Sequence, residues 1–169
     1  MQLPDAEQLL IQLTESIRRD ISPSTALVGI HTGGVWLAER LLQNLQLPLP
    51  SGTLDVSFYR DDFAQIGLHP QVRPSDIPFT VEGSHIILVD DVLYTGRTIR
   101  AAINELFDYG RPASVRLAAL IDRGGRELPI AAQYVGAVVD VPSDKMLALE
   151  QSADGTLGLS LYSKIRDNE

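Results

Sequence analysis

The stretch ILVDDVLYTGRTI, residues 87–99, runs a hydrophobic segment directly into two adjacent carboxylates, Asp90 and Asp91. A buried carboxylate is costly unless a partner offsets the cost, so we expect this pair at an edge of the fold where a ligand arrives. The residues Thr95-Gly96-Arg97-Thr98 then lead into a segment with helical periodicity, 99–107. The stretch therefore predicts a strand, a loop and a helix in succession, with a ligand site in the loop.

The rest of the chain repeats this alternation of hydrophobic strands and amphipathic helices. Asp5 with Gln8 has the spacing of a capping box, opening a helix that continues to residue 21, and Gly33-Gly34 opens a second helix that continues to residue 45. Strands are expected at 25–31, 53–59, 85–89 and 114–121, with 133–139 as a fifth candidate and a hairpin of 145–150 with 156–162. This order predicts an α/β fold with a central, mostly parallel sheet flanked by helices.

Length and composition narrow the class of protein. The 169 residues fit a single domain, 1–169, and the absence of cysteine excludes disulfides, cysteine-ligated zinc and thiolate nucleophiles. No apolar run approaches the roughly 20 residues of a membrane span. The N-terminal MQLPDAEQLL lacks the basic region of a signal peptide, so we expect a cytoplasmic protein. The net charge of -8 disfavours nonspecific binding of nucleic acid, so any anionic partner needs a local site.

Two turns are expected to line one crevice. In a parallel sheet, ligands bind beyond the carboxyl ends of the strands, where both Gly33-Gly34 and Asp90-Asp91 fall. The segment Thr95–Thr98 precedes a helix, whose first backbone N–H groups and dipole suit a phosphate, and Gly96 lets the backbone approach its oxygens. The two carboxylates can accept hydrogen bonds from a vicinal diol and can stabilise a cationic sugar C1. The pattern is typical of a site for a ribose 5-phosphate.

Two other interpretations use the same residues. Asp90-Asp91 after a strand also fits a magnesium site in a phosphoryl-transfer enzyme, and Thr95 or Thr98 also fits a simple helix cap. The chain contains neither GxxxxGK[ST] nor GxGxxG, so the ordinary ATP and dinucleotide loops are missing. Order and spacing therefore favour the ribose-phosphate interpretation.

These motifs resemble a known family. VDDVLYTGRT resembles the phosphoribosyl pyrophosphate motif of type I phosphoribosyltransferases, and GIHTGG resembles their pyrophosphate loop. More narrowly, the chain resembles the PyrR family, bifunctional pyrimidine operon regulators with uracil phosphoribosyltransferase activity. The segments that carry this resemblance, within residues 26–136, are SFYRDDF, VDDVLYTGRTIRAA, DYGRPASV and LIDRGGRELPI.

The resemblance implies that uracil and phosphoribosyl pyrophosphate give UMP and pyrophosphate, with Mg²⁺ bridging the pyrophosphate and ribose oxygens. Asp90, Asp91 and Arg60 are the implied catalytic residues, and the two aspartates would reach the metal only through ribose hydroxyls or water. The pyrophosphate would bind at the 32–34 turn and the 5-phosphate at the 95–98 loop. The base would bind under a small hood within residues 123–169. The implied substrate-binding residues are Thr32, Gly33, Gly34, Val92, Leu93, Tyr94, Thr95, Gly96, Arg97, Thr98, Asp122, Arg123 and Val135.

Two irregular regions complete the expected site. Residues 60–79 are expected to form a lid that excludes water, with Arg60 reaching the departing pyrophosphate, although a charged RDD run is also typical of a solvated surface. Residues 123–169 are expected to form a small hood over the base and a C-terminal hairpin. Tyr134 fits either this hood or the core.

At four positions, this chain lacks a basic residue or a histidine that regulators of this family carry there. The positions are Gly33, Gly125, Ala131 and Ala137. The family implies a messenger RNA leader as a partner, but only Arg18, Arg123 and Arg126 remain as basic candidates, which disfavours RNA binding.

Two alternatives to the uracil enzyme stay open, and the family also implies an oligomer. One is a UMP-sensing regulator of pyrimidine genes, acting through RNA or a partner protein with weak or no catalysis. The other is a phosphoribosyltransferase for another base, such as a purine, because the sequence of the hood gives the least information about which base binds. A homodimer or a higher oligomer is implied by the family.

Overall fold

The structure, a computed structural model, describes residues 1–56 and 75–164. Its main sheet has the strand order β2-β1-β3-β4-β5, and every neighbouring pair is parallel. The strands of this sheet are β1 (Thr25–Ile30), β2 (Ser51–Leu54), β3 (His85–Leu93), β4 (Ser114–Asp122) and β5 (Tyr134–Val138). The remaining elements are α1 (Ala6–Arg18), α2 (Gly33–Leu45), α3 (Arg97–Phe107) and the antiparallel hairpin of β6 (Lys145–Gln151) with β7 (Leu157–Ser163).

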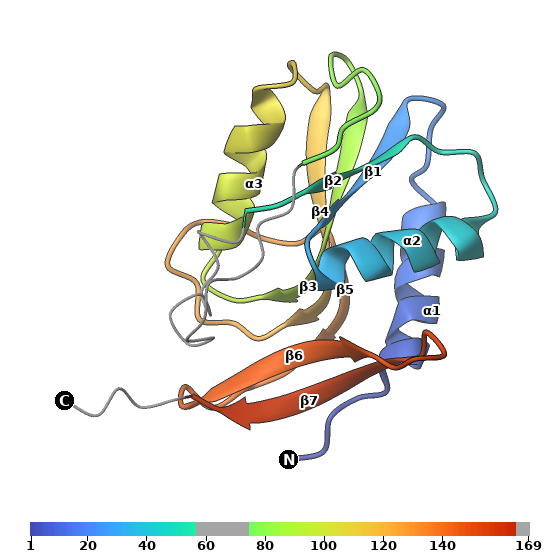
Figure 1. The fold of residues 1–169 in the computed structure, drawn as a ribbon. Coiled ribbons are helices and arrows are strands. Elements are labelled where there is room, and N and C mark those ends of the chain that lie inside the picture. The colour runs from blue at the N-terminus through green and yellow to red at the C-terminus, as the bar shows by residue number, and fades with distance from the viewer. Residues whose placement is uncertain (57–74, 165–169) are drawn as a thin grey trace.

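Helices cover both faces of the sheet, so the predicted α/β class is confirmed. Helices α1 and α2 lie on one face and α3 lies on the other (Figure 1). Successive strand residues point to opposite faces. Leu27 and Ile87 therefore pack with α1 and α2, whereas Val28 and Leu88 pack with α3. None of the helices in the described ranges is long and apolar enough to cross a membrane.

The first helix and the central strand differ in length from the sequence expectation. The Asp5 carboxylate caps α1 as predicted, accepting a hydrogen bond from the Gln8 backbone N–H at 3.1 Å, but the helix ends at Arg18 rather than at residue 21. Strand β3 continues past residue 89 to Leu93, because its last residues stay paired with β4. The aspartate pair therefore lies within the end of a strand rather than after it.

The second strand begins earlier than expected. It covers Ser51–Leu54, whereas the sequence predicts a strand over 53–59, of which residues 57–59 lie outside the described residues. The fifth strand and the C-terminal hairpin are both confirmed. Tyr134 belongs to the core, with 5% of its surface exposed, so its core interpretation is the correct one.

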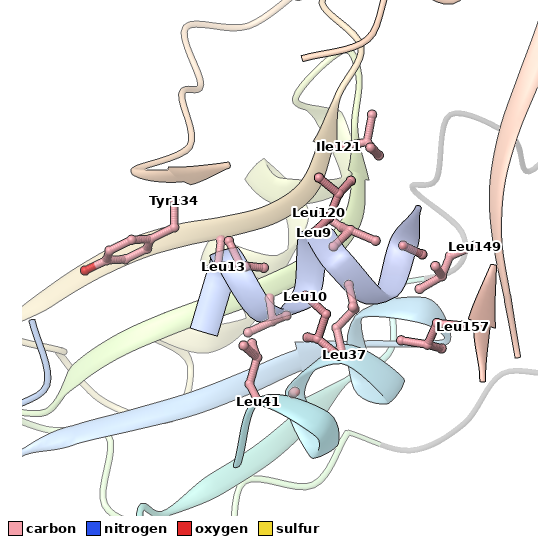
Figure 2. Close-up of a cluster of buried hydrophobic side chains, with 14 of the residues drawn as sticks. Leu9, Leu10, Leu13, Leu37, Leu41, Leu120, Ile121, Tyr134, Leu149 and Leu157 are labelled. Atoms are coloured by element: carbon pink, nitrogen blue, oxygen red, sulfur yellow. The ribbon is translucent and has the colours of Figure 1, made fainter. Parts of the chain in front are cut away.

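The C-terminal hairpin is packed onto the same core as α1 and α2. Leu149 of β6 and Leu157 of β7 join the cluster that contains Leu10, Leu37 and Leu41 (Figure 2). Strand β6 contacts β3 and α2, and β7 contacts α1. The hairpin is therefore part of the domain core and lies beside the end of the central strand.

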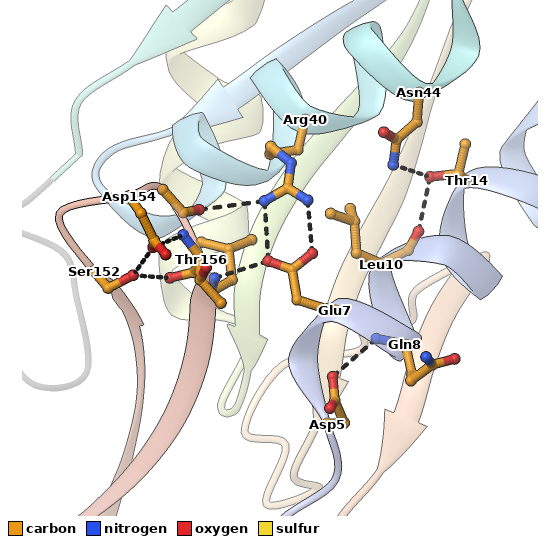
Figure 3. Close-up of polar contacts among 12 residues, drawn as sticks. Asp5, Glu7, Gln8, Leu10, Thr14, Arg40, Asn44, Ser152, Asp154 and Thr156 are labelled. Carbon is orange, nitrogen blue, oxygen red and sulfur yellow. Dashed lines mark hydrogen bonds and ion pairs between the residues drawn. The ribbon is translucent and has the colours of Figure 1, made fainter.

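A polar cluster also attaches the hairpin to α1 and α2 (Figure 3). Arg40 donates two hydrogen bonds to the Glu7 carboxylate, at 3.0 and 2.6 Å, and a third to the Gly155 carbonyl at 3.3 Å. The Leu157 backbone N–H donates to the same carboxylate at 2.8 Å. These contacts, chiefly the hydrogen bond from Arg40, hold the pKa of Glu7 below its usual value although burial opposes them. One bidentate ion pair thus joins three elements that are distant in sequence.

Candidate active site

The two turns that the sequence places at the carboxyl ends of β1 and β3 are in direct contact. A Cβ atom added to Gly33 would lie 2.5 Å from Oδ2 of Asp91, and one added to Gly34 would lie 2.2 Å from the carbonyl oxygen of Val89. The peptide bond that enters this turn, between His31 and Thr32, is cis. Glycine at both positions allows the start of α2 to approach the end of β3, which brings the predicted pyrophosphate turn beside the aspartate pair.

The aspartate pair is buried at the carboxyl end of the central strand, β3. Asp90 is 3% exposed and Asp91 is 7% exposed. Each carboxylate accepts a hydrogen bond from the next backbone N–H, Asp90 from Asp91 at 3.0 Å and Asp91 from Val92 at 2.9 Å. Two adjacent carboxylates at a strand end suit a vicinal diol.

The 95–98 loop forms the N-terminus of α3. Gly96 is the N-cap residue with φ of 94°, a left-handed conformation that favours glycine. The Thr95 hydroxyl accepts a hydrogen bond from the Arg97 backbone N–H at 3.2 Å, and Thr95 is 6% exposed. Gly96 itself has no side chain that could cap α3. Amide groups and the helix dipole therefore make this loop a suitable place for a phosphate.

Residues 127–130 contact the 95–98 loop and support it. The sequence gives no indication of this role. The Thr95 carbonyl accepts hydrogen bonds from the Glu127 and Leu128 backbone N–H groups, at 2.9 and 3.2 Å. A Cβ atom on Gly96 would lie 3.0 Å from Cγ1 of Ile130. The ELPI residues that carry the family resemblance therefore brace the phosphate loop.

Asp122 is engaged within its own loop. Arg126 donates to the Asp122 carboxylate at 2.6 Å, and the Gly124 backbone N–H donates to it at 2.9 Å. Burial opposes ionisation, but these two hydrogen bonds outweigh it and hold the pKa of Asp122 below its usual value. Arg126 also donates to the carbonyls of Tyr94 and Ile130, each at 2.8 Å. Asp122 thus orients the guanidinium of Arg126, which joins the loop after β4 to the carbonyls of Tyr94 and Ile130.

Arg123 and Val135, both predicted to bind substrate, have different surroundings. The Arg123 side chain is 8% exposed and donates to the carbonyls of Val141, Pro142 and Lys145. Val135 is half-buried in β5 and is paired with Ala119 of β4. The structure therefore brings the 32–34 turn, the aspartate pair and the 95–98 loop together, and it directs Arg123 to the segment before β6.

Arg60 and the lid as far as residue 74 lie outside the described residues. The chain on either side of that segment is joined by an antiparallel bridge, in which the backbones of Thr53 and Asp76 exchange hydrogen bonds of 2.7 and 2.9 Å. Ser75 donates to the Glu105 carboxylate of α3 at 2.5 Å. These contacts hold the two ends of that segment beside β2 and α3.

The carboxylates fit a magnesium ion that is held largely by substrate. Among the described residues, no group of three or more His, Asp or Glu side chains is arranged to hold a metal. Mg²⁺ commonly takes one or two carboxylates, substrate phosphates and several waters. Asp90 and Asp91 supply that number of carboxylates, and they would act through water or through ribose hydroxyls.

Comparison with known proteins agrees with this geometry. Residues 2–145 match the phosphoribosyl transferase domain family. A Bifunctional protein PyrR of Pseudomonas savastanoi pv. phaseolicola is 54% identical over 153 residues, covering 88% of this chain and 90% of that protein. The Bifunctional protein PyrR of Nitrosococcus oceani is 62% identical over 126 residues, covering 73% and 71%. A hypoxanthine-guanine phosphoribosyltransferase of Bacillus anthracis shares the fold, with a TM-score of 0.66 at 21% identity over 83% of this chain and 84% of that one. The chain therefore belongs to the PyrR family of type I phosphoribosyltransferases.

Proposed function

We propose that the chain is a uracil phosphoribosyltransferase. It transfers the ribose 5-phosphate group of phosphoribosyl pyrophosphate to uracil, so that UMP forms and pyrophosphate leaves. The observation that carries this proposal is the contact of the 32–34 turn with the buried pair Asp90-Asp91, directly before a phosphate loop at 95–98. Relatives named Bifunctional protein PyrR, 54% identical over most of the chain, support the same reaction.

Each part of the site takes one part of the substrate. Asp90 and Asp91 accept hydrogen bonds from the ribose hydroxyls, and their negative charge stabilises the cationic C1 that develops as the pyrophosphate leaves. The backbone N–H groups and hydroxyls of 95–98 hold the 5-phosphate. The backbone of the 32–34 turn meets the pyrophosphate. Positioning of the two substrates, rather than acid-base chemistry, supplies most of the rate enhancement.

The remaining groups complete the reaction. Mg²⁺, when bound with the substrate, neutralises charge on the pyrophosphate and makes it a better leaving group. Arg60 is proposed to contact the pyrophosphate, and residues 60–79 are proposed to exclude water. The loop after β4, with Asp122 and Val135 nearby, forms the hood that selects the base.

A turnover assay with phosphoribosyl pyrophosphate and Mg²⁺ tests the proposal. Uracil, hypoxanthine, guanine and orotate are offered separately, and the nucleotide product is identified by chromatography. UMP from uracil alone is the expected result. A purine nucleotide as the main product would show that the enzyme acts on a purine base rather than on uracil. Absence of any nucleotide, with UMP still bound, would favour a UMP-sensing regulator with little catalysis.

The second candidate function is regulation of pyrimidine genes, and the name of the relatives as bifunctional proteins favours it. The three basic candidates for RNA binding already donate hydrogen bonds within the chain. Arg18 donates to the carbonyls of Asn44 and Leu45 at 3.0 and 3.1 Å, and Arg123 and Arg126 donate to loop carbonyls. Regulation in this chain therefore depends more on UMP binding than on a basic RNA-binding face. Titration with a labelled leader RNA, with and without UMP, tests whether regulation depends more on UMP binding than on RNA binding.

We also propose that the protein is a cytoplasmic homodimer or a higher oligomer. Large apolar side chains exposed to solvent are compatible with an interface between copies. Among them are Phe107, Tyr109 and Val138, with exposed fractions of 51%, 45% and 79%. Light scattering on the purified protein measures the oligomeric state directly.

A further inference from the structure

Arg123 directly follows β4 and is a buried cation whose side chain is directed to backbone carbonyls. Its Nη1 donates to the Lys145 carbonyl at 3.2 Å, and its Nη2 lies 3.4 and 3.3 Å from the Val141 and Pro142 carbonyls. Its Nε is buried and has no hydrogen-bond partner among the described residues. Both ends of the guanidinium fork are thus committed to the segment that leads into β6. Lysine, with a single ammonium group, cannot reproduce this fork.

The same guanidinium lies over the ring of Tyr94. Its Cζ is 3.9 Å from the ring centroid, well within the distance of a cation–π contact. A Cβ atom on Gly125 would lie 2.5 Å from Cε2 of this ring, so a larger residue at 125 would require the ring to shift. Lys164, directly after β7, has its Nζ at 5.6 Å from the same centroid. The ring of Tyr94 is therefore held by residues from the loop after β4 and from the end of the hairpin.

Tyr94 directly precedes the phosphate loop. Its carbonyl accepts a hydrogen bond from Arg126 at 2.8 Å, and its neighbour Thr95 supplies the carbonyl that the 127–128 backbone grips. A shift of Tyr94 would therefore shift Thr95. These contacts connect the segment before β6 to Arg123, Arg123 to Tyr94, and Tyr94 to the amides at the start of α3.

We propose that Arg123 is a positioning residue that couples the C-terminal hairpin to the phosphate loop through Tyr94. The hairpin thereby takes part in forming the site for the 5-phosphate, although it lies far from that loop in the sequence. The coupling rests on the proposed function only for its effect on substrate binding, because the contacts themselves exist without substrate.

Hydrogen exchange of the free protein tests the coupling without substrate. R123K removes the fork while keeping the charge. It is expected to raise amide exchange both in the hairpin segment 141–149 and in the loop 94–98. R40M is the matched control, because it loosens the other end of the hairpin at Gly155 without touching Tyr94. R40M is expected to raise exchange around 150–158 and to leave the loop unchanged. Faster exchange confined to the hairpin in R123K would overturn the proposal.

Substrate affinity supplies the second readout. R123K is expected to raise KM for phosphoribosyl pyrophosphate about tenfold with kcat within about twofold, since a cation–π contact and a buried fork are both weakened. Y94L is expected to give a similar rise, and the double variant is expected to be no worse than Y94L alone. Additive effects, or an equal rise in R40M, would contradict a path through Tyr94. A wild-type protein that binds no phosphoribosyl pyrophosphate would refute the proposed function, while the exchange experiment still decides the coupling.

Discussion

Replacing Gly33 and Gly34 by alanine, one at a time, tests how the two turns of the site meet. Both glycines begin α2, where helix propensity alone predicts that alanine stabilises the protein by about 0.5–1 kcal/mol. The structure predicts the opposite sign. A Cβ atom at 34 would lie 2.2 Å from the Val89 carbonyl oxygen and 3.2 Å from Cα of Asp90, both backbone atoms. A Cβ atom at 33 would instead lie 2.5 Å from a carboxylate oxygen of Asp91, a side chain that can rotate.

The two variants therefore fail in different ways. G34A must separate α2 from β3 by about 1 Å to reach ordinary contact distance, and overpacking of this kind costs about 1–3 kcal/mol of folding stability. G33A keeps the backbone in place but turns the Asp91 carboxylate away from the ribose. Loss of a hydrogen bond to a charged group costs about 1.5–3 kcal/mol, which lowers kcat/KM by a factor of about 10 to 160.

Denaturant unfolding and steady-state kinetics on the same preparations separate these effects. G158A is the matched control, because Gly158 lies on exposed β7 and an added Cβ atom would meet nothing within 4 Å. It is expected to change neither stability nor turnover by a significant amount. If G33A and G34A both gained stability and kept wild-type kcat/KM, the close approach of the two turns would be refuted.

Three further predictions concern the carboxylates, the hairpin and the charge. The double variant D90N/D91N is expected to lose turnover while its circular dichroism stays native, and wild-type turnover would refute the diol role. E7Q is expected to lower unfolding free energy by about 1–3 kcal/mol, because Arg40 keeps a half-buried charge with a weaker partner. Since the folded protein lowers the pKa of Glu7, its contribution is present above about pH 4.5 and is lost as the pH falls below that value. The stability of E7Q should therefore fall less steeply with acid, and equal slopes would contradict this. Affinity for a leader RNA is expected to be weak with a shallow salt dependence, and a steep slope would reveal a basic face.

The elements and the location of the site were predictable because their signals are local. Apolar residues at helical or strand spacing fixed the alternation of strands and helices. The adjacency of Asp90-Asp91 to Thr95–Thr98 then indicated one ligand site at the end of one strand. The parallel sheet supplied the rest, since the carboxyl ends of β1 and β3 meet at one edge and bring Gly33 beside Asp91.

The contacts that hold the site in shape were not predictable, because they join side chains to backbone groups far along the chain. No spacing in the sequence indicates that Arg123 grips the carbonyls before β6, or that Glu127 donates its N–H to Thr95. The length of β3 was underestimated for a related reason. Polar Asp90 and Asp91 look like the end of a strand in sequence, whereas pairing with β4 continues through them.

The distribution of charge explains how an acidic protein can still hold a substrate with several phosphates. Arg97, within the 95–98 loop, forms an ion pair with Glu127, and Arg126 forms one with Asp122, whereas Arg123 is directed to backbone carbonyls. Helices α2 and α3 both begin at the edge of the sheet where the aspartate pair lies, at Gly33 and Arg97. The N-cap residues Thr32 and Gly96 make no side-chain capping hydrogen bond in either helix. Under the proposed function, two helix N-termini offer amide groups to the two ends of the substrate, so their fixed dipoles would supplement Arg60 and Arg97, and Mg²⁺ would neutralise further phosphate charge.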